Sequence, residues 1–184
     1  MVGMTVVERH AGPWTREQRD ALPDDGRRHE LLDGLLVVTP APRPRHQVSL
    51  TWLLTTLTAR CPDDLRVLPA PVDVVLDDRT IVEPDLVVVR RDDIAEKDLP
   101  VPPRLAVEIL SPGNRGFDLV DKWEMYQRAG IASYWVVDPE RGELIAWELR
   151  DGAYLEVARV SGGEPFHAEQ PFPVTIVPAE ITRP

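Results

Sequence analysis

The amino-acid sequence predicts an α/β (α+β) fold in which helices flank a mixed central β-sheet. Apolar residues recur at helical spacing over residues 44–60, which indicates one long amphipathic helix. Short apolar segments divided by charged or proline-rich turns follow over residues 65–110, which is typical of strands. A second helical segment, residues 117–130, then precedes another strand-like run. Helices interleaved with strands in this order favour a layered fold of sheet and helices.

The first elements along the chain are expected to be a short helix and a hairpin. The helix lies around TREQRDAL, residues 15–22, because Thr15 suits the N-cap position. The hairpin lies in HELLDGLLVVTP, residues 29–40, where the pair Asp33-Gly34 joins two short apolar runs. An Asp-Gly pair between strand-like segments is a strong local signal for a hairpin turn.

The second half of the chain is expected to alternate strands with tight turns. The helix of residues 117–130 ends at Gly130, because glycine suits a left-handed C-cap. The strands that follow are SYWVVD, ELIAWELR, AYLEVA and, in the tail, one more short strand around FPVTIV.

Length and composition indicate one soluble domain. The 184 residues, 43% of them hydrophobic, are expected to form a single domain over 1–184, with an N-terminal extension (1–24), a core (25–158) and a C-terminal tail (159–184). No apolar run approaches the ~20 residues of a membrane helix, and the N-terminus lacks a signal-peptide core. Cys61 is the only cysteine, which excludes an internal disulfide and a cysteine-based zinc site. We expect a cytoplasmic protein without a membrane partner.

Four charged residues interrupt apolar segments: Glu30, Asp85, Glu108 and Lys122. Glu108 is the most unusual, because in RLAVEILSP its neighbours on both faces of the expected strand are apolar. A buried carboxylate is costly unless a cation pairs with it or it takes up a proton. The other three also have ordinary interpretations: Asp85 as a turn cap, Glu30 as a solvated strand residue, and Lys122 as the helical partner of Asp118.

The two carboxylates Asp85 and Glu108 lie on strands expected to be neighbours, and such a pair can bind a hard cation such as Mg²⁺. A cation there would neutralise both groups. A lysine nearby could stabilise charge on a phosphate or orient the attacking water. This set suits metal-assisted hydrolysis of a phosphodiester, and the sequence contains no serine elbow, Walker loop or dinucleotide fingerprint that would indicate another chemistry.

The order of these motifs resembles the Uma-two family, restriction-endonuclease-like proteins assigned to the PD-(D/E)xK nuclease superfamily. The resemblance rests on EPD, AVEILSP, a helix with the pattern D-x-x-x-K-x-x-x-Y and AGIASYWVVDP, together with HELLDGLLVV and PRPRHQ nearer the N-terminus. It covers about residues 25–150. It implies a restriction-endonuclease-like core, a Mg²⁺ or Mn²⁺ cofactor and DNA as the substrate.

Carried over to this chain, the resemblance implies Asp85 as the acid of the PD element and Glu108 as the acid of (D/E)xK. Both would be metal ligands, and the backbone carbonyl of Ile109 would be a further ligand. Glu30 corresponds to the additional acid that the N-terminal half often contributes.

The chain departs from the superfamily at the lysine position. The residue two places after the acid is Leu110, so the resemblance nominates Lys122 on the following helix. Tyr126 and Asp118 lie one turn to either side of Lys122 on the same helical face, and His46 begins the long helix. These three are candidate substrate contacts. The alternatives are packing for Tyr126, and a cap or solvent contact for His46.

The favoured function is therefore a divalent-metal-dependent endonuclease that hydrolyses DNA. The formal net charge of −10 opposes it, because phosphate backbones repel an acidic chain. Several arginines could offset this charge if they line one groove, namely Arg43, Arg45, Arg90, Arg91, Arg104 and Arg115. The alternatives are a non-catalytic dimeric binding or regulatory module that keeps a structural metal, and a hydrolase of a small phosphorylated substrate. A homodimer through the hairpin ELIAWELRDGAYLEV is the expected assembly.

Overall fold

The computed structural model describes residues 6–8, 12–23, 25–39, 41–111 and 117–182. The first half contains β1 (Val6–Glu8), α1 (Arg16–Asp20), β2 (Arg28–Leu32), β3 (Leu35–Thr39), α2 (Pro44–Thr58), β4 (Leu65–Pro69), β5 (Val74–Asp77), β6 (Thr80–Val82) and β7 (Leu86–Arg90), which leads into a 3₁₀ turn (Arg91–Asp93). The second half contains β8 (Leu105–Ile109), a π-helical turn (Phe117–Asp121), α3 (Lys122–Ala129), β9 (Ser133–Asp138), β10 (Glu143–Arg150), β11 (Ala153–Ser161), β12 (Phe166–Ala168), β13 (Val174–Ile176) and α4 (Pro178–Ile181). Within the described ranges, no helix combines the length and apolarity that a membrane crossing requires.

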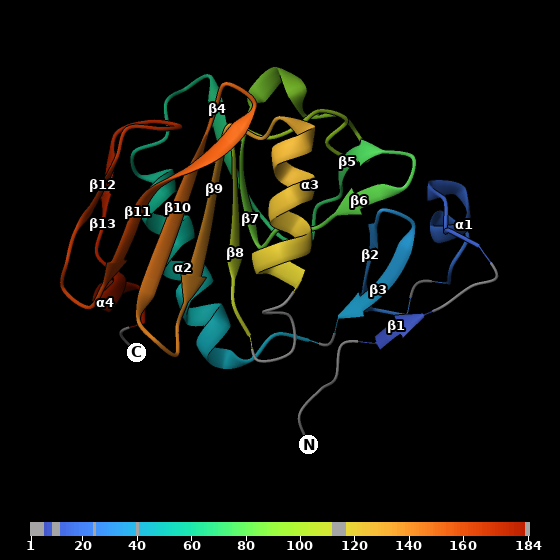
Figure 1. Cartoon of the computed structure of the whole chain (residues 1–184), viewed down its shortest axis with the longest axis horizontal. Helices are drawn as coiled ribbons and strands as arrows, with labels where there is room; N and C mark the ends of the chain where they lie inside the picture. Colours follow the sequence, from blue (N-terminus) through green and yellow to red (C-terminus); the bar gives the residue numbers. More distant parts are fainter. Residues whose placement is uncertain (1–5, 9–11, 24, 40, 112–116, 183–184) are drawn as a thin grey trace.

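The centre of the molecule is a six-stranded mixed sheet with the order β11-β10-β9-β8-β7-β4. Only β8 and β9 run parallel, and α3 connects them. The predicted mixed sheet flanked by helices is confirmed. An antiparallel sheet of order β1-β3-β2-β6-β5 lies beyond α3, and β12 pairs with β13 on the opposite side, next to α4 (Figure 1).

The two faces of the central sheet have different helical covers, α2 on one and α3 on the other (Figure 1). Along β8, Val107 and Ile109 pack in the cluster that includes α2, whereas Ala106 packs in the cluster that includes α3. Glu108 alternates with Val107 and Ile109, so it points to the α3 face. Burial on both faces explains why β8 is almost entirely apolar, and why its one carboxylate requires a partner.

The C-terminal tail contains more structure than the single strand predicted for it. Strand β11 continues to Ser161, and the tail then forms the β12–β13 hairpin and α4. Buried side chains such as Phe166, Phe172 and Ile181 join this part to the cluster that includes α2. These apolar residues are too widely spaced to show a period in the sequence, and they are recognisable only once the face of the sheet that they cover is known.

Local signals identified several turns and caps correctly. Thr15 caps α1 through a capping box with Gln18. Gly130 caps α3 in the left-handed region, with φ +82°. Asp33 and Gly34 both have positive φ, 51° and 82°, which is the conformation of the hairpin turn that an Asp-Gly pair favours.

Gly34 should be more sensitive to substitution than a glycine of the same conformation elsewhere. A Cβ at Gly34 would lie 2.6 Å from Cβ of Pro13, whereas one at Gly152, also left-handed (φ +81°), would meet nothing within 4 Å. We expect Gly152→Ala to lower the free energy of unfolding by about 1–2 kcal/mol. Gly34→Ala should cost about 1–3 kcal/mol more, because a packed contact must move as well. Urea denaturation of both variants tests this, and equal losses would contradict it.

Candidate metal and catalytic site

The register of β7 and β8 places two predicted acids opposite each other. Leu86 pairs with Val107 in this antiparallel ladder, so Asp85 comes opposite Glu108 one residue further along. Side chains at directly opposite positions share one face, with Cβ atoms about 4.5–5.5 Å apart. The backbone carbonyl of Asp85 accepts a hydrogen bond from the N–H of Ala70 (3.0 Å), which anchors this end of the strand.

Glu108 faces a lysine and a tyrosine of α3. Nζ of Lys122 donates to its Oε1 at 2.9 Å, and the hydroxyl of Tyr126 donates to the same oxygen at 2.7 Å. Lys122 and Tyr126 are four residues apart, so they share one face of the helix. Lys122 is thus a cation that the protein itself places beside Glu108.

Lys122 also joins Glu108 to Glu30. Its Nζ lies 2.8 Å from Oε1 of Glu30, whose carboxylate comes from β2 in the other sheet. All three side chains are buried. Burial acts to raise the pKa of Glu30, but the charges of Lys122 and Arg28 outweigh it and lower that pKa. The side chain of Asp118, the helical partner considered for Lys122 and a candidate substrate contact, lies outside the described part of the chain.

Asp85 is held by three donors. Its Oδ2 accepts from the N–H of Ile109 (2.8 Å) and from Nε2 of His46 (3.0 Å), and its Oδ1 accepts from a guanidinium nitrogen of Arg28 (3.0 Å). Burial opposes ionisation, but the hydrogen bond from His46, the charge of Arg28 and the Ile109 N–H lower the pKa of Asp85 to about 2. Asp85 is therefore a carboxylate at neutral pH.

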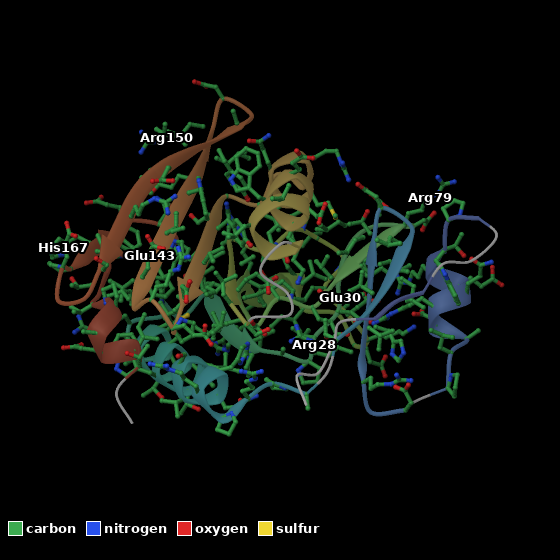
Figure 2. All side chains as sticks on the ribbon, turned by 60° about the horizontal axis from the view of Figure 1, so that its bottom comes forward. Arg28, Glu30, Arg79, Glu143, Arg150 and His167 are labelled. Carbon is green, nitrogen blue, oxygen red and sulfur yellow. The ribbon has the colours of Figure 1, made fainter. Side chains whose placement is uncertain are left out.

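Arg28 and Glu83 belong to the same cluster, and the sequence analysis did not identify them. Arg28 donates to the backbone carbonyl of Glu83, and its Nε lies 3.5 Å from the Glu83 carboxylate. The N–H of Glu83 donates to Glu30 at 2.9 Å. Figure 2 shows Arg28 and Glu30 together on the β2–β3 hairpin where it meets the rest of the molecule. A period of two along the chain, Arg28 with Glu30 and Glu83 with Asp85, was the signal that could have revealed both.

The cluster carries more negative than positive charge. Glu30, Glu83, Asp85 and Glu108 face Lys122 and Arg28, four carboxylates against two cations. Burial raises the pKa of Glu108 to about 7, with the charges of Asp85 and Glu30 adding to the rise and that of Lys122 opposing it. A further cation would lower this pKa, so the cluster has the electrostatic character of a cation site.

The donor chemistry fits a Mg²⁺-type ion with few protein ligands. In the described ranges, no group of three or more His, Cys, Asp or Glu side chains is arranged to hold a metal. Proteins commonly bind Mg²⁺ through one or two carboxylates plus water and substrate phosphate. Asp85 and Glu108 can supply the two carboxylates. Glu108 contacts Lys122 and Tyr126 through Oε1, and both oxygens of Asp85 have partners.

Two candidate substrate contacts, His46 and Tyr126, are buried against the two predicted acids. His46 is buried against Asp85 and neither caps α2 nor faces solvent. Tyr126 is fully buried, with its ring 5.0 Å from that of Tyr134 and its hydroxyl on Glu108. Both side chains therefore orient the carboxylates in this structure.

The arginines that could offset the acidic charge lie at two different ends of the sheet. Arg43 and Arg45 are exposed and flank the start of α2, beside His46. Arg90 and Arg104 are also exposed, but they lie where β7 ends and β8 begins, about 13–17 Å from the two acids at about 3.3 Å per residue. Only the first pair is close to the site. Arg115 lies outside the described residues.

The central mixed sheet presents two acids on an antiparallel strand pair, beside a lysine from the next helix. The family model of Uma2, described as "Putative restriction endonuclease", matches residues 16–180, and the chain belongs to this family. The predicted resemblance is thereby confirmed. The structure is similar to the crystal structure of "a putative nuclease belonging to DUF820" from Anabaena variabilis, with a TM-score of 0.74 and 17% identity over 92% of this chain and 98% of that chain. No curated protein matches the sequence.

Proposed function

We propose that the protein is a divalent-metal-dependent endonuclease that hydrolyses phosphodiester bonds in DNA. The observation that carries the proposal is a set of three buried carboxylates: Glu30 and Glu108 both pair with Lys122, and Asp85 lies opposite Glu108 on the neighbouring strand. Burying so many charges is costly and does not by itself favour stability. Such a cluster on a nuclease-like fold therefore supports a role in function.

In this proposal Asp85, Glu108 and the backbone carbonyl of Ile109 hold Mg²⁺ or Mn²⁺. The bound ion supplies an activated water and charge to polarise the phosphate. Lys122, buried at 2.9 Å from Glu108, fixes that carboxylate and adds positive charge beside the scissile phosphate. Glu30 keeps Lys122 in place, and His46 and Tyr126 orient Asp85 and Glu108.

The test is cleavage of supercoiled and of single-stranded DNA by purified protein with Mg²⁺ or Mn²⁺, with EDTA as the metal-free control. The proposal expects nicked and linear products that require the metal. A regulatory module that keeps only a structural metal would bind the ion without turnover. Failure to cleave any DNA with either ion would contradict the proposal.

A second candidate function is hydrolysis of a small phosphorylated substrate. The net charge of −10 favours it, because a small substrate does not have to approach the whole acidic surface. The two functions differ in whether residues beyond the carboxylate cluster contact the substrate.

The two arginine pairs separate these candidates. For an endonuclease, we expect the double variant Arg43→Gln/Arg45→Gln to weaken DNA binding and to reduce the salt dependence by about 1–2 units of log–log slope. Its rate on bis(p-nitrophenyl) phosphate should stay within about twofold of the wild type, since the substrate is too small to reach past the carboxylates. Arg90→Gln/Arg104→Gln removes the same charge far from the site and is the matched control. Equal effects of the two pairs on DNA binding would contradict a DNA path over the start of α2.

A further inference from the structure

Arg28 is a direct hydrogen-bond partner of Asp85, the residue proposed as a metal ligand. Its guanidinium donates to Oδ1 of Asp85 at 3.0 Å, while His46 and the Ile109 N–H occupy Oδ2. Both oxygens of this carboxylate are therefore engaged. Glu108 contacts Lys122 and Tyr126 of α3 through Oε1.

Arg28 also has a second set of acceptors beside Asp85. It donates to the backbone carbonyl of Glu83, and its Nε lies 3.5 Å from Oε2 of that residue. Glu83 is itself held on its other oxygen by Arg19 at 3.5 Å, and Arg19 is anchored by Asp73 at 2.6 Å. A guanidinium that gives up Asp85 would keep its hydrogen bond to the Glu83 carbonyl and its ion pair with the Glu83 carboxylate.

We propose that Arg28 is a positioning residue that fixes the orientation of the Asp85 carboxylate and limits the affinity of the site for a divalent cation. This rests on the proposed function, since it assumes that Asp85 is a metal ligand. Arg28 competes with the ion for Oδ1 of Asp85, and the charge of Arg28 repels the ion in a poorly solvated site. Without Arg28, Asp85 would lose one donor and the cluster would lose one of its two cations.

The test is calorimetric titration of the full chain with Mn²⁺ alone. We expect Arg28→Gln to bind Mn²⁺ at least about tenfold more tightly than the wild type, because one repelling charge and one competing donor are removed. Arg27→Gln is the matched control. Arg27 is 55% exposed and pairs with Asp25, so its loss changes the net charge equally, and the affinity should stay within about twofold of the wild type.

The outcomes separate the two proposals. Wild-type binding that is unchanged or weakened in Arg28→Gln would overturn the role of Arg28 and leave the proposed function intact. Binding by neither protein would overturn the metal site, and with it both proposals. An equal gain in Arg27→Gln would show a general charge effect and would also overturn the role of Arg28.

The loss of Arg28 could also unfold the protein, because Asp85 and Glu83 would remain buried without it. Thermal unfolding with and without Mn²⁺ covers that case, since a ligand that binds only the folded state stabilises it in proportion to its affinity. We expect Mn²⁺ to raise the Tm of Arg28→Gln more than that of the wild type, or to restore its folded circular dichroism spectrum. A variant that stays unfolded in saturating Mn²⁺ would contradict the proposal.

Discussion

Asp85→Asn and Glu108→Gln are each expected to reduce Mg²⁺-dependent DNA cleavage by more than about a hundredfold. Loss of a group that only supports a metal ligand already costs roughly 10–100-fold, and these two side chains are proposed to bind the ion directly. The amide variants keep the shape of the buried side chains, so the fold should survive. Initial rates of nicking at saturating Mg²⁺ measure the effect.

The controls for these variants separate catalysis from folding. Glu169→Gln changes an exposed acid in the tail and should cleave like the wild type. Near-ultraviolet circular dichroism should be unchanged in the two site variants. A folded Asp85→Asn or Glu108→Gln protein whose rate stays within about threefold of the wild type would exclude that residue as a metal ligand.

Lys122→Met is expected to lower the free energy of unfolding by about 3–5 kcal/mol, because removing one partner leaves uncompensated buried charge. Lys122 is the cation between Glu30 and Glu108, at 2.8 and 2.9 Å. Part of the loss should return in the double variant Lys122→Met/Glu108→Gln, where one of the two carboxylates is neutral. Urea denaturation at neutral pH measures both values.

A surface lysine provides the matched control for Lys122. Lys97 pairs with Asp20 at 2.7 Å but is 65% exposed, and exposed pairs contribute at most about 1 kcal/mol. Lys97→Met should therefore change stability little. Comparable losses of unfolding free energy in Lys122→Met and Lys97→Met would show that the bridge between Glu30 and Glu108 contributes no more to stability than an exposed ion pair. In cleavage assays, Lys122→Met should lower turnover more than it lowers Mn²⁺ affinity.

Local sequence signals were sufficient to predict most helices and strands and to predict which face of β8 carries Glu108. Alternation alone placed Glu108 with Ala106, on the side that α3 covers in the structure. The capping residue Thr15 and the turn at Asp33-Gly34 were also readable, because each depends only on its neighbours in the chain.

The partners of the charged residues could not be predicted from local sequence signals. That Lys122 bridges Glu108 to Glu30 depends on how the β2–β3 hairpin approaches α3, because Lys122 and Glu30 are 92 positions apart in the chain (122 − 30). Arg28 was overlooked because an arginine at the start of a strand is usually exposed. Burial of His46 against Asp85 likewise depends on how α2 lies across the sheet.

The most direct test of the metal site is anomalous diffraction from a crystal of the wild-type protein soaked in Mn²⁺. The site argued here predicts one strong peak about 2 Å from carboxylate oxygens of both Asp85 and Glu108, with Arg28 displaced toward Glu83. No peak between these two residues, at a Mn²⁺ concentration that supports DNA cleavage in solution, would contradict the assignment of the site.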